Sequence, residues 1–173
     1  ACGFFERMSF RLCDGLSGIA PEEVDALVIA GMGGETIANI LEAAPWVKEK
    51  DFPIILQPMS TQAELRGWLW RNGFLCLREK TVLEGETLYS IILARQGGAV
   101  PMTPAEEWAG RQYPGMEDPL RGLLLDHLLG RVRRALDGMA RSRAPAEARR
   151  RELEQVLEGL MEMRKEWDAW QQR

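Results

Sequence analysis

The sequence predicts an α/β fold, with a mostly parallel sheet that ends in an antiparallel hairpin and is followed by an α-helical coiled-coil hairpin. The first observation is a strand, a glycine-rich turn and a helix over residues 26–41, which together form the repeating unit of parallel α/β sheets. The second is another apolar strand over residues 53–57, followed by a helix and two further strands. The third is a pair of heptad series after residue 120, the pattern of packed coiled-coil helices.

A strand is predicted first at Met8–Cys13, because apolar and polar residues alternate there. Asp14-Gly15-Leu16 follows at the end of this strand. An acidic side chain just beyond a strand can accept hydrogen bonds from the amine or hydroxyl groups of a ligand at the carboxyl edge of a sheet. The same residues also fit an ordinary Asp-Gly turn, so the pattern leaves both interpretations open.

The central element is Ala26–Ala30, whose small and β-branched apolar residues predict a strand buried on both faces. The strand stops at Gly31-Met32-Gly33-Gly34, and helical spacing begins at Glu35. Three glycines in four residues let a backbone touch a flat or charged ligand, and the helix start adds unpaired N–H donors. A tight turn that needs positive φ explains the glycines equally well. The spacing G-x-G-G does not match the dinucleotide-binding fingerprint.

The next strand, Pro53–Gln57, ends at Gln57-Pro58-Met59, again at the carboxyl edge of the predicted sheet. The amide of Gln57 offers two donors and an acceptor, which suits the edge of a base, and Pro58 ends the strand. Thr61-Gln62-Ala63-Glu64 has the form of a capping box and predicts the start of a helix. Asn72-Gly73 is expected to close that helix.

Two strands, Phe74–Lys80 and Thr87–Arg95, are predicted to form a hairpin around Glu84-Gly85-Glu86. Gly97-Gly98 then marks a change of composition towards proline and glycine. We therefore expect a partial α/β domain over residues 1–97, and a linker with a helical coiled-coil domain over residues 98–173.

Heptad spacing in the last third of the chain predicts two antiparallel helices joined by the short segment Ala140–Pro145. The residues expected to form the seam between these helices are Leu125, Val132, Met139, Leu153, Leu160 and Trp167. Residues 130–173 hold eleven Lys/Arg against eight Asp/Glu. A solvated helix face explains this balance, which also fits a polyanionic partner. The arginines that flank the join and are predicted to include phosphate contacts are Arg131, Arg133, Arg134, Arg149, Arg150 and Arg151.

The overall composition narrows the possible classes of protein. The chain carries a formal net charge of −4 and is 46% hydrophobic, which is ample for a core. It contains no apolar run long enough to span a membrane. Its three cysteines are scattered and have no metal-ligand spacing. Reduced thiols suit a cytoplasmic protein, and we expect neither a metal nor a membrane as a partner.

Three stretches together resemble one known family. RLCDGL, VIAGMGGETIANIL and ILQPMSTQAELRGWLWRNGF, followed by a strand pair and a coiled-coil tail, resemble the bacterial tRNA (adenine-22-N1)-methyltransferases. These are class I enzymes that use S-adenosylmethionine and combine a Rossmann-like domain with a C-terminal coiled-coil domain. The resemblance covers nearly the whole chain, and the pair AGMGG and LQPM is its most specific part.

The resemblance implies a role for each motif. Asp14, Gly15, Leu16 and Ala30 fall where such enzymes hold the methyl donor, with the first three at its adenine end. The catalytic edge, where the donor methyl meets the target base, falls on Gly31, Met32, Gly33, Gly34, Gln57 and Pro58. Met32 and Met59 are candidate lining residues, and the helical hairpin helps to hold the tRNA.

The chain also departs from this family. The family begins with a helix and two further βα units, which carry the glycine-rich motif for the methionine part of the donor and the acidic residue for its ribose. Residues 1–13 cannot replace them, so we expect a fragment or an incomplete sequence. The alternative function is therefore a non-catalytic module that binds protein or RNA through its coiled-coil hairpin. Adenine N1 attacks with its own lone pair, so an enzyme can act mainly by positioning, which agrees with the absence of a recognisable acid–base dyad in the sequence.

Overall fold

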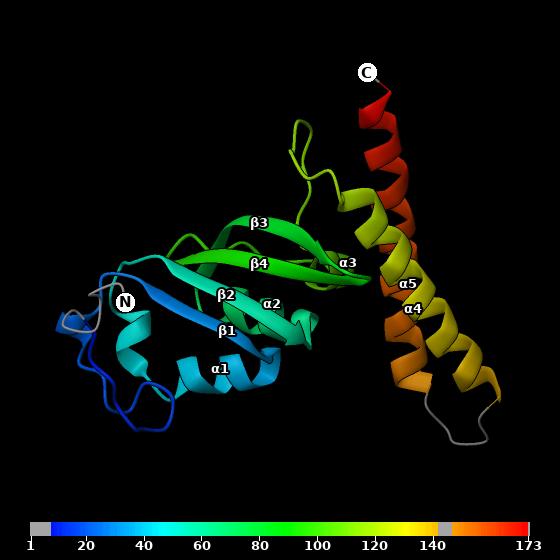
Figure 1. Cartoon of the computed structure of the whole chain (residues 1–173). Helices are drawn as coiled ribbons and strands as arrows, with labels where there is room; N and C mark the ends of the chain where they lie inside the picture. The colour runs from blue at the N-terminus through cyan, green and yellow to red at the C-terminus, as the bar shows by residue number, and fades with distance from the viewer. Residues whose placement is uncertain (1–7, 142–146, 173) are drawn as a thin grey trace.

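The computed structural model describes residues 8–141 and 147–172, and its centre is a four-stranded mixed sheet (Figure 1). The strands lie in the order β1-β2-β4-β3, with β1 parallel to β2 and with β4 antiparallel to both of its neighbours. Their bounds are β1 Leu27–Gly33, β2 Ile54–Ser60, β3 Phe74–Glu84 and β4 Thr87–Gln96. This is the predicted α/β sheet with an antiparallel end hairpin, and both hairpin strands are longer than predicted.

The helices pack against the sheet and against one another. Their bounds are α1 Gly34–Glu42, α2 Gln62–Arg71, α3 Pro104–Ala109, α4 Arg121–Arg141 and α5 Glu147–Gln171, with short 3₁₀ helices at Pro21–Glu23 and Pro45–Lys48. Helices α1 and α2 lie on one face of the sheet (Figure 1). Their apolar residues join those of the strands in one core. Burial of each large apolar side chain in this core stabilises the fold by about 1.5–3 kcal/mol.

The two faces of the sheet differ. Leu27 and Ile29 of β1 are buried under the helices, whereas Val28 between them is 64% exposed. Ile55 of β2, the register partner of Val28, and Ile91 of β4 are also exposed. The prediction that β1 is buried on both faces is therefore wrong for the described residues, because the helices among these residues cover only one face of the sheet. The other side is an open apolar surface.

Two local predictions near β1 also need correction. The strand does not stop at Ala30 but continues to Gly33, with a break in register between Ala30 and Met32, and α1 starts at Gly34. The predicted strand Met8–Cys13 is an exposed segment without regular structure. Alternation alone does not make a strand, since a strand needs a hydrogen-bonded neighbour. Among the described residues, β1 pairs only with β2.

Helices α4 and α5 form an antiparallel helical hairpin, which we call the arm (Figure 1). Of the predicted seam residues, those buried between its helices and α3 are Leu125, Val132, Leu153, Leu160 and Trp167, while Met139 is half-buried. Helix α3 packs closely against α5, since a Cβ on Gly159 would lie 2.5 Å from the Cβ of Ala105. The predicted join falls largely on residues 142–146, outside the described residues. No helix in the described ranges is both long and apolar enough to cross a membrane.

Candidate functional site

The carboxyl ends of β1 and β2 lie side by side and bring two predicted motifs together. Ala30 is the register partner of Gln57, Met32 of Pro58, and Gly33 of Ser60. We call this region, Ala30–Gly34 and Gln57–Thr61, the glycine edge. It contains every residue predicted for the catalytic edge, together with Ala30.

Of the three glycines on this edge, Gly31 alone has a positive φ. Its φ is +77°, a region that favours glycine, and a Cβ there would meet nothing within 4 Å. Its N–H donates a 2.8 Å hydrogen bond to the side-chain oxygen Oε1 of Gln57. The side-chain oxygen of Gln57 therefore accepts a hydrogen bond within the protein, and the amide keeps two N–H donors.

Gly33 and Gly34 serve a different purpose. The φ of Gly33 is −64°, so a side chain would not strain the backbone there, although its Cβ would lie 3.2 Å from Oγ of Ser60. A Cβ on Gly34 would lie 2.2 Å from the backbone oxygen of Thr61. The start of α1 thus touches the chain leaving β2, and only glycine permits that approach.

Thr61 is the N-cap residue of α2, as predicted, but the predicted capping box does not form. Its side chain makes no cap bond to α2, and its backbone is left-handed, with φ 48° and ψ 42°. The Thr61 hydroxyl instead accepts a 3.2 Å hydrogen bond from the N–H of Glu35 in α1. This conformation costs about 1–3 kcal/mol in a residue other than glycine. Such strained residues cluster at functional sites, and the sequence pattern contained no signal for it.

None of the side chains on the glycine edge carries a charge. Met32 and Met59 are largely exposed, whereas Pro58 is buried. The edge therefore offers bare backbone, two polarizable thioethers and the amide of Gln57. Such a surface can accept a flat ring and its polar edge, but among the described residues it holds no titratable pair for acid–base chemistry.

The predicted donor residues Asp14-Gly15-Leu16 do not join this edge in the described structure. Gly15 has φ +52°, and its Cβ would lie 3.1 Å from Ile40 in the last part of α1. Gly15 and Leu16 line an open cavity of about 600 Å³ together with Ala26 and Leu27, where β1 begins. Gly15 and Leu16 thus lie near the start of β1, whereas the glycine edge lies at its carboxyl end.

An ion pair anchors this N-terminal segment. The guanidinium of Arg11 contacts the carboxylate of Glu23 and also donates a 2.9 Å hydrogen bond to the carbonyl of Gly18. The hydrogen bond from Arg11, with a second from the N–H of Ala20, lowers the pKa of Glu23 to about 2. Both charged side chains are well exposed, so the pair holds the segment in place without a buried charge.

The predicted RNA-binding arginines fall into two groups. Arg149, Arg150 and Arg151 each pair with a glutamate on α5 itself, at 2.8, 2.9 and 3.4 Å. Arg131, Arg133 and Arg134 on α4 are exposed and form no ion pair with another described residue. The guanidinium of Arg131 stands over the ring of Trp108 at 5.6 Å. Surface ion pairs contribute about 0–1 kcal/mol, so all six arginines remain available to an anion.

A network of buried charges connects the arm to the sheet. Arg66 of α2 is 1% exposed and binds the Glu79 carboxylate of β3 at 2.7 and 3.0 Å. It also donates to the carbonyls of Glu107 and Trp108, each at 2.9 Å. We call Arg66, Glu79 and Arg121 the arginine joint. It was missed by sequence analysis, because the partners of Arg66 lie on β3 and α3, far from it in the sequence.

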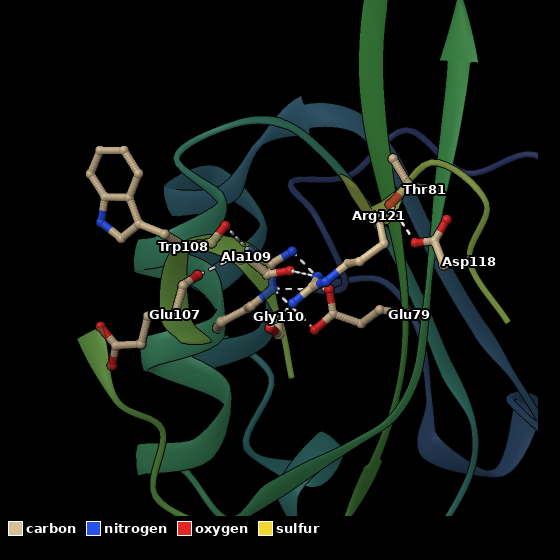
Figure 2. A network of polar contacts seen from close by, with 9 residues as sticks. Glu79, Thr81, Glu107, Trp108, Ala109, Gly110, Asp118 and Arg121 are labelled. Atoms are coloured by element: carbon tan, nitrogen blue, oxygen red, sulfur yellow. Dashed lines mark hydrogen bonds and ion pairs between the residues drawn. The ribbon is translucent and has the colours of Figure 1, made fainter. Parts of the chain in front are cut away.

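Arg121 at the start of α4 completes the arginine joint (Figure 2). It is 1% exposed and donates to the carbonyls of Ala109 and, at 2.8 Å, Gly110. Burial lowers the pKa of Arg121 to about 10, so the side chain is protonated at neutral pH. Beside it, the hydroxyl of Thr81 donates a 2.7 Å hydrogen bond to the buried carboxylate of Asp118. The arm is therefore fixed to the sheet by satisfied charges rather than by a flexible linker.

Comparison with known proteins identifies relatives of this chain. Residues 1–92 match the family model described as a methyltransferase domain. The curated tRNA (adenine(22)-N(1))-methyltransferase of Bacillus subtilis is 36% identical over 95 residues, which cover 55% of this chain and 40% of that protein. The chain thus spans less than half the length of this relative. The family match favours an enzyme over the alternative of a non-catalytic module.

Two solved structures share the fold. A Streptococcus agalactiae protein of the NADB-Rossmann superfamily aligns with a TM-score of 0.75 and 25% identity, over 94% of this chain and 70% of that chain. A Streptococcus pneumoniae protein crystallised in complex with S-adenosyl-L-methionine aligns with a TM-score of 0.70 and 24% identity, over 89% of this chain and 67% of that chain. The arm and the sheet therefore belong to one known Rossmann-like arrangement.

Proposed function

The chain belongs to the methyltransferase-domain family, and we propose that it transfers a methyl group from S-adenosylmethionine to N1 of an adenine in tRNA, at position 22 in the D-loop region. The observation that carries this proposal is the glycine edge, where two strand ends expose backbone and thioethers instead of charged side chains. The similarity to the Bacillus subtilis enzyme supports the choice of substrate.

The chemistry requires alignment more than proton transfer. The lone pair of adenine N1 forms a bond to the methyl carbon as the bond between that carbon and the sulfonium sulfur breaks. The donor leaves as a neutral thioether, and the positive charge moves to the adenine. No proton leaves N1, so positioning supplies the rate enhancement, an effect worth up to about 7–11 kcal/mol. A surface without a titratable pair is suited to this reaction.

The proposal assigns the parts of the glycine edge as follows. Ala30 lies against the methyl end of the donor, and Gly31 and Gly33 leave room for the ring of the target base. Gly34 lets the start of α1 approach Thr61 and so shapes this end of the site. The free NH₂ group of Gln57 faces that base, with Pro58 holding the strand end. Met32 and Met59 cover the unstacked adenine, which costs a few kcal/mol to expose.

The remaining assignments concern the donor and the RNA. Asp14, Gly15 and Leu16 are proposed to contact the adenine end of the donor, and the cavity of about 600 Å³ that Gly15 and Leu16 border has room for a purine. The arm arginines are proposed to include contacts to tRNA phosphates, without every one of them touching the RNA. We place the reaction in the cytoplasm, since Cys13 and Cys76 are free thiols, as in reducing compartments.

One experiment tests the reaction and its target together. The chain is incubated with methyl-labelled S-adenosylmethionine and either an unmodified tRNA transcript or the same transcript with guanine at position 22. We expect label in the first RNA and none in the second. Calorimetric titration with S-adenosylmethionine accompanies the assay. Binding of tRNA without binding of the donor would overturn the proposed enzymatic activity and favour the alternative of a non-catalytic module.

A further inference from the structure

A small cleft connects the glycine edge with the arm. It is lined by Thr61 and Gln62 at the start of α2, by Trp108 of α3, by Leu128 and Arg131 of α4, and by Arg149 of α5. Thr61 is the last residue of the glycine edge. The cleft therefore begins where the proposed reaction surface ends and reaches the arm.

The charges in this cleft favour an anion. Arg131 lies over Trp108 and forms no ion pair with another described residue. The partner of Arg149, Glu152, is half exposed, and such a pair exchanges readily for a better one. The first turn of α2 has no side-chain cap, because the Thr61 hydroxyl is bonded to α1. Its N–H groups therefore add donors beside the two guanidinium groups.

The cleft is small, with a volume of about 110 Å³. This space is sufficient for a phosphate group. Arg131 covers one face of the Trp108 ring. Glu64 also lines the cleft and is exposed, so the phosphate must lie on the side of the arginines.

We propose that this cleft is a phosphate subsite, in which Arg131 and Arg149 hold one backbone phosphate of the substrate RNA between the arm and the glycine edge. This inference rests on the proposed function. By fixing one phosphate beside Thr61, the subsite sets the distance at which the target adenine reaches the strand ends. Arg131 and Arg149 are positioning residues and do not touch the reacting atoms.

Neighbouring arginines provide matched controls. Arg149 and Arg150 are adjacent on α5, both are about half exposed, and each pairs with a glutamate on the same helix. Only Arg149 lines the cleft. On α4, Arg131 lines it and Arg134 does not. Each pair of alanine variants removes the same charge from the same helix, so general electrostatic attraction to RNA changes equally.

The test measures the affinity of the whole chain for an unmodified tRNA transcript over a range of salt concentrations. We expect Arg149→Ala and Arg131→Ala each to weaken binding about tenfold at low salt. The slope of log affinity against log salt should fall by about 1, because one phosphate contact is lost. Arg150→Ala and Arg134→Ala should have much smaller effects, and Arg149→Lys should restore most of the affinity.

The possible outcomes separate the two proposals. Failure of the unmodified chain to bind tRNA overturns the proposed function, and the subsite falls with it. Binding by the unmodified chain, with equal losses for Arg149→Ala and Arg150→Ala, overturns the subsite alone. Circular dichroism melting of every variant identifies any loss of affinity caused by unfolding, in which case Arg149→Lys gives the decisive comparison.

Discussion

At the glycine edge, segments meet through backbone; at the arginine joint, they meet through buried charged side chains. Gly34 allows the carbonyl of Thr61 to approach α1, and Thr61 accepts a left-handed conformation to bond Glu35. In the joint, Arg66 and Arg121 reach carbonyls at the end of α3, and Glu79 neutralises part of their charge. The first region leaves its surface open to a ligand, whereas the second is closed to water.

The contacts in the two regions differ in their energetic cost and in what they leave exposed. Close backbone contact costs little and leaves no side chain in the space above the strand ends. Buried charges cost several kcal/mol each to desolvate and must be fully paired. The edge is therefore built to receive something, and the joint is built to hold the arm at one angle. Substitutions in the two regions should differ in size and in kind.

The largest expected effect is that of Arg66→Ala in the joint. It leaves the Glu79 carboxylate with little exposure and without its strongest partner, and it frees the carbonyls of Glu107 and Trp108. Removal of one partner of a buried pair costs about 3–5 kcal/mol. Urea unfolding measures the change, with Arg71→Ala as control, since Arg71 pairs with Glu107 at an exposed position. Equal losses in the two variants would contradict the importance of the joint.

Gly34→Ala should cause the next largest loss of stability. Its Cβ would lie 2.2 Å from the Thr61 oxygen, so the chain leaving β2 must move. Overpacking of this kind costs about 1–3 kcal/mol. Thermal melting should show the loss, and the structure of the variant should show displacement at Thr61. A melting temperature equal to that of the unchanged chain would mean that the backbone contact is not required.

Gly31→Ala should lower the free energy of unfolding by less than Gly34→Ala does, and for another reason. Nothing obstructs its Cβ, but the φ of +77° is unfavourable for alanine, at about 1–2 kcal/mol. At Gly33 the φ is negative, and the nearest atom to an added Cβ would be the rotatable hydroxyl of Ser60. The stability of Gly33→Ala should therefore change by less than about 1 kcal/mol. If the edge is the reaction surface, Gly33→Ala lowers methyl transfer while the melting temperature is retained. Unchanged transfer would remove Gly33 from the site.

The smallest effect concerns the thiol of Cys76, which lies near the joint. Burial, with a smaller effect of Glu79, raises its pKa to about 12. The reactive thiolate is therefore scarce at pH 8, and alkylation should accelerate as the pH rises towards 12. Cys13 is exposed and should react first. Mass spectrometry of labelled peptides measures both rates. Faster labelling of Cys76 in Arg66→Ala would show that the joint keeps this region closed.

The sequence predicted those elements whose signal is local. The heptads located α4 and α5, and Gly85 located the β3–β4 hairpin. The motifs at Gly31 and Gln57 predicted two strand ends that share one edge, because parallel strands end on the same side. The predicted roles of these residues and of the arm arginines remain predictions.

Other features depend on neighbours that the pattern does not reveal. The sequence pattern around Val28 predicts a buried residue. Its burial, however, depends on what covers the face of the sheet on which it lies, and Val28 is exposed. Met8–Cys13 alternates like a strand but finds no strand beside it within the described residues. Thr61 has the spacing of a cap and bonds a different helix. Arg66 finds Glu79 only after β3 has folded against α2, so spacing within the helix carries no trace of the pair.

The arginine joint also has a consequence for cooperativity. Its groups come from α2, β3, the end of α3 and the start of α4, so it exists only when the sheet and the arm are both formed. A partly assembled joint would leave guanidinium and carboxylate groups desolvated without partners, which is worse than no joint at all. Intermediates with one folded half are therefore penalised. We therefore expect the α/β layer and the helical arm to unfold in a single calorimetric transition, although they are different architectures.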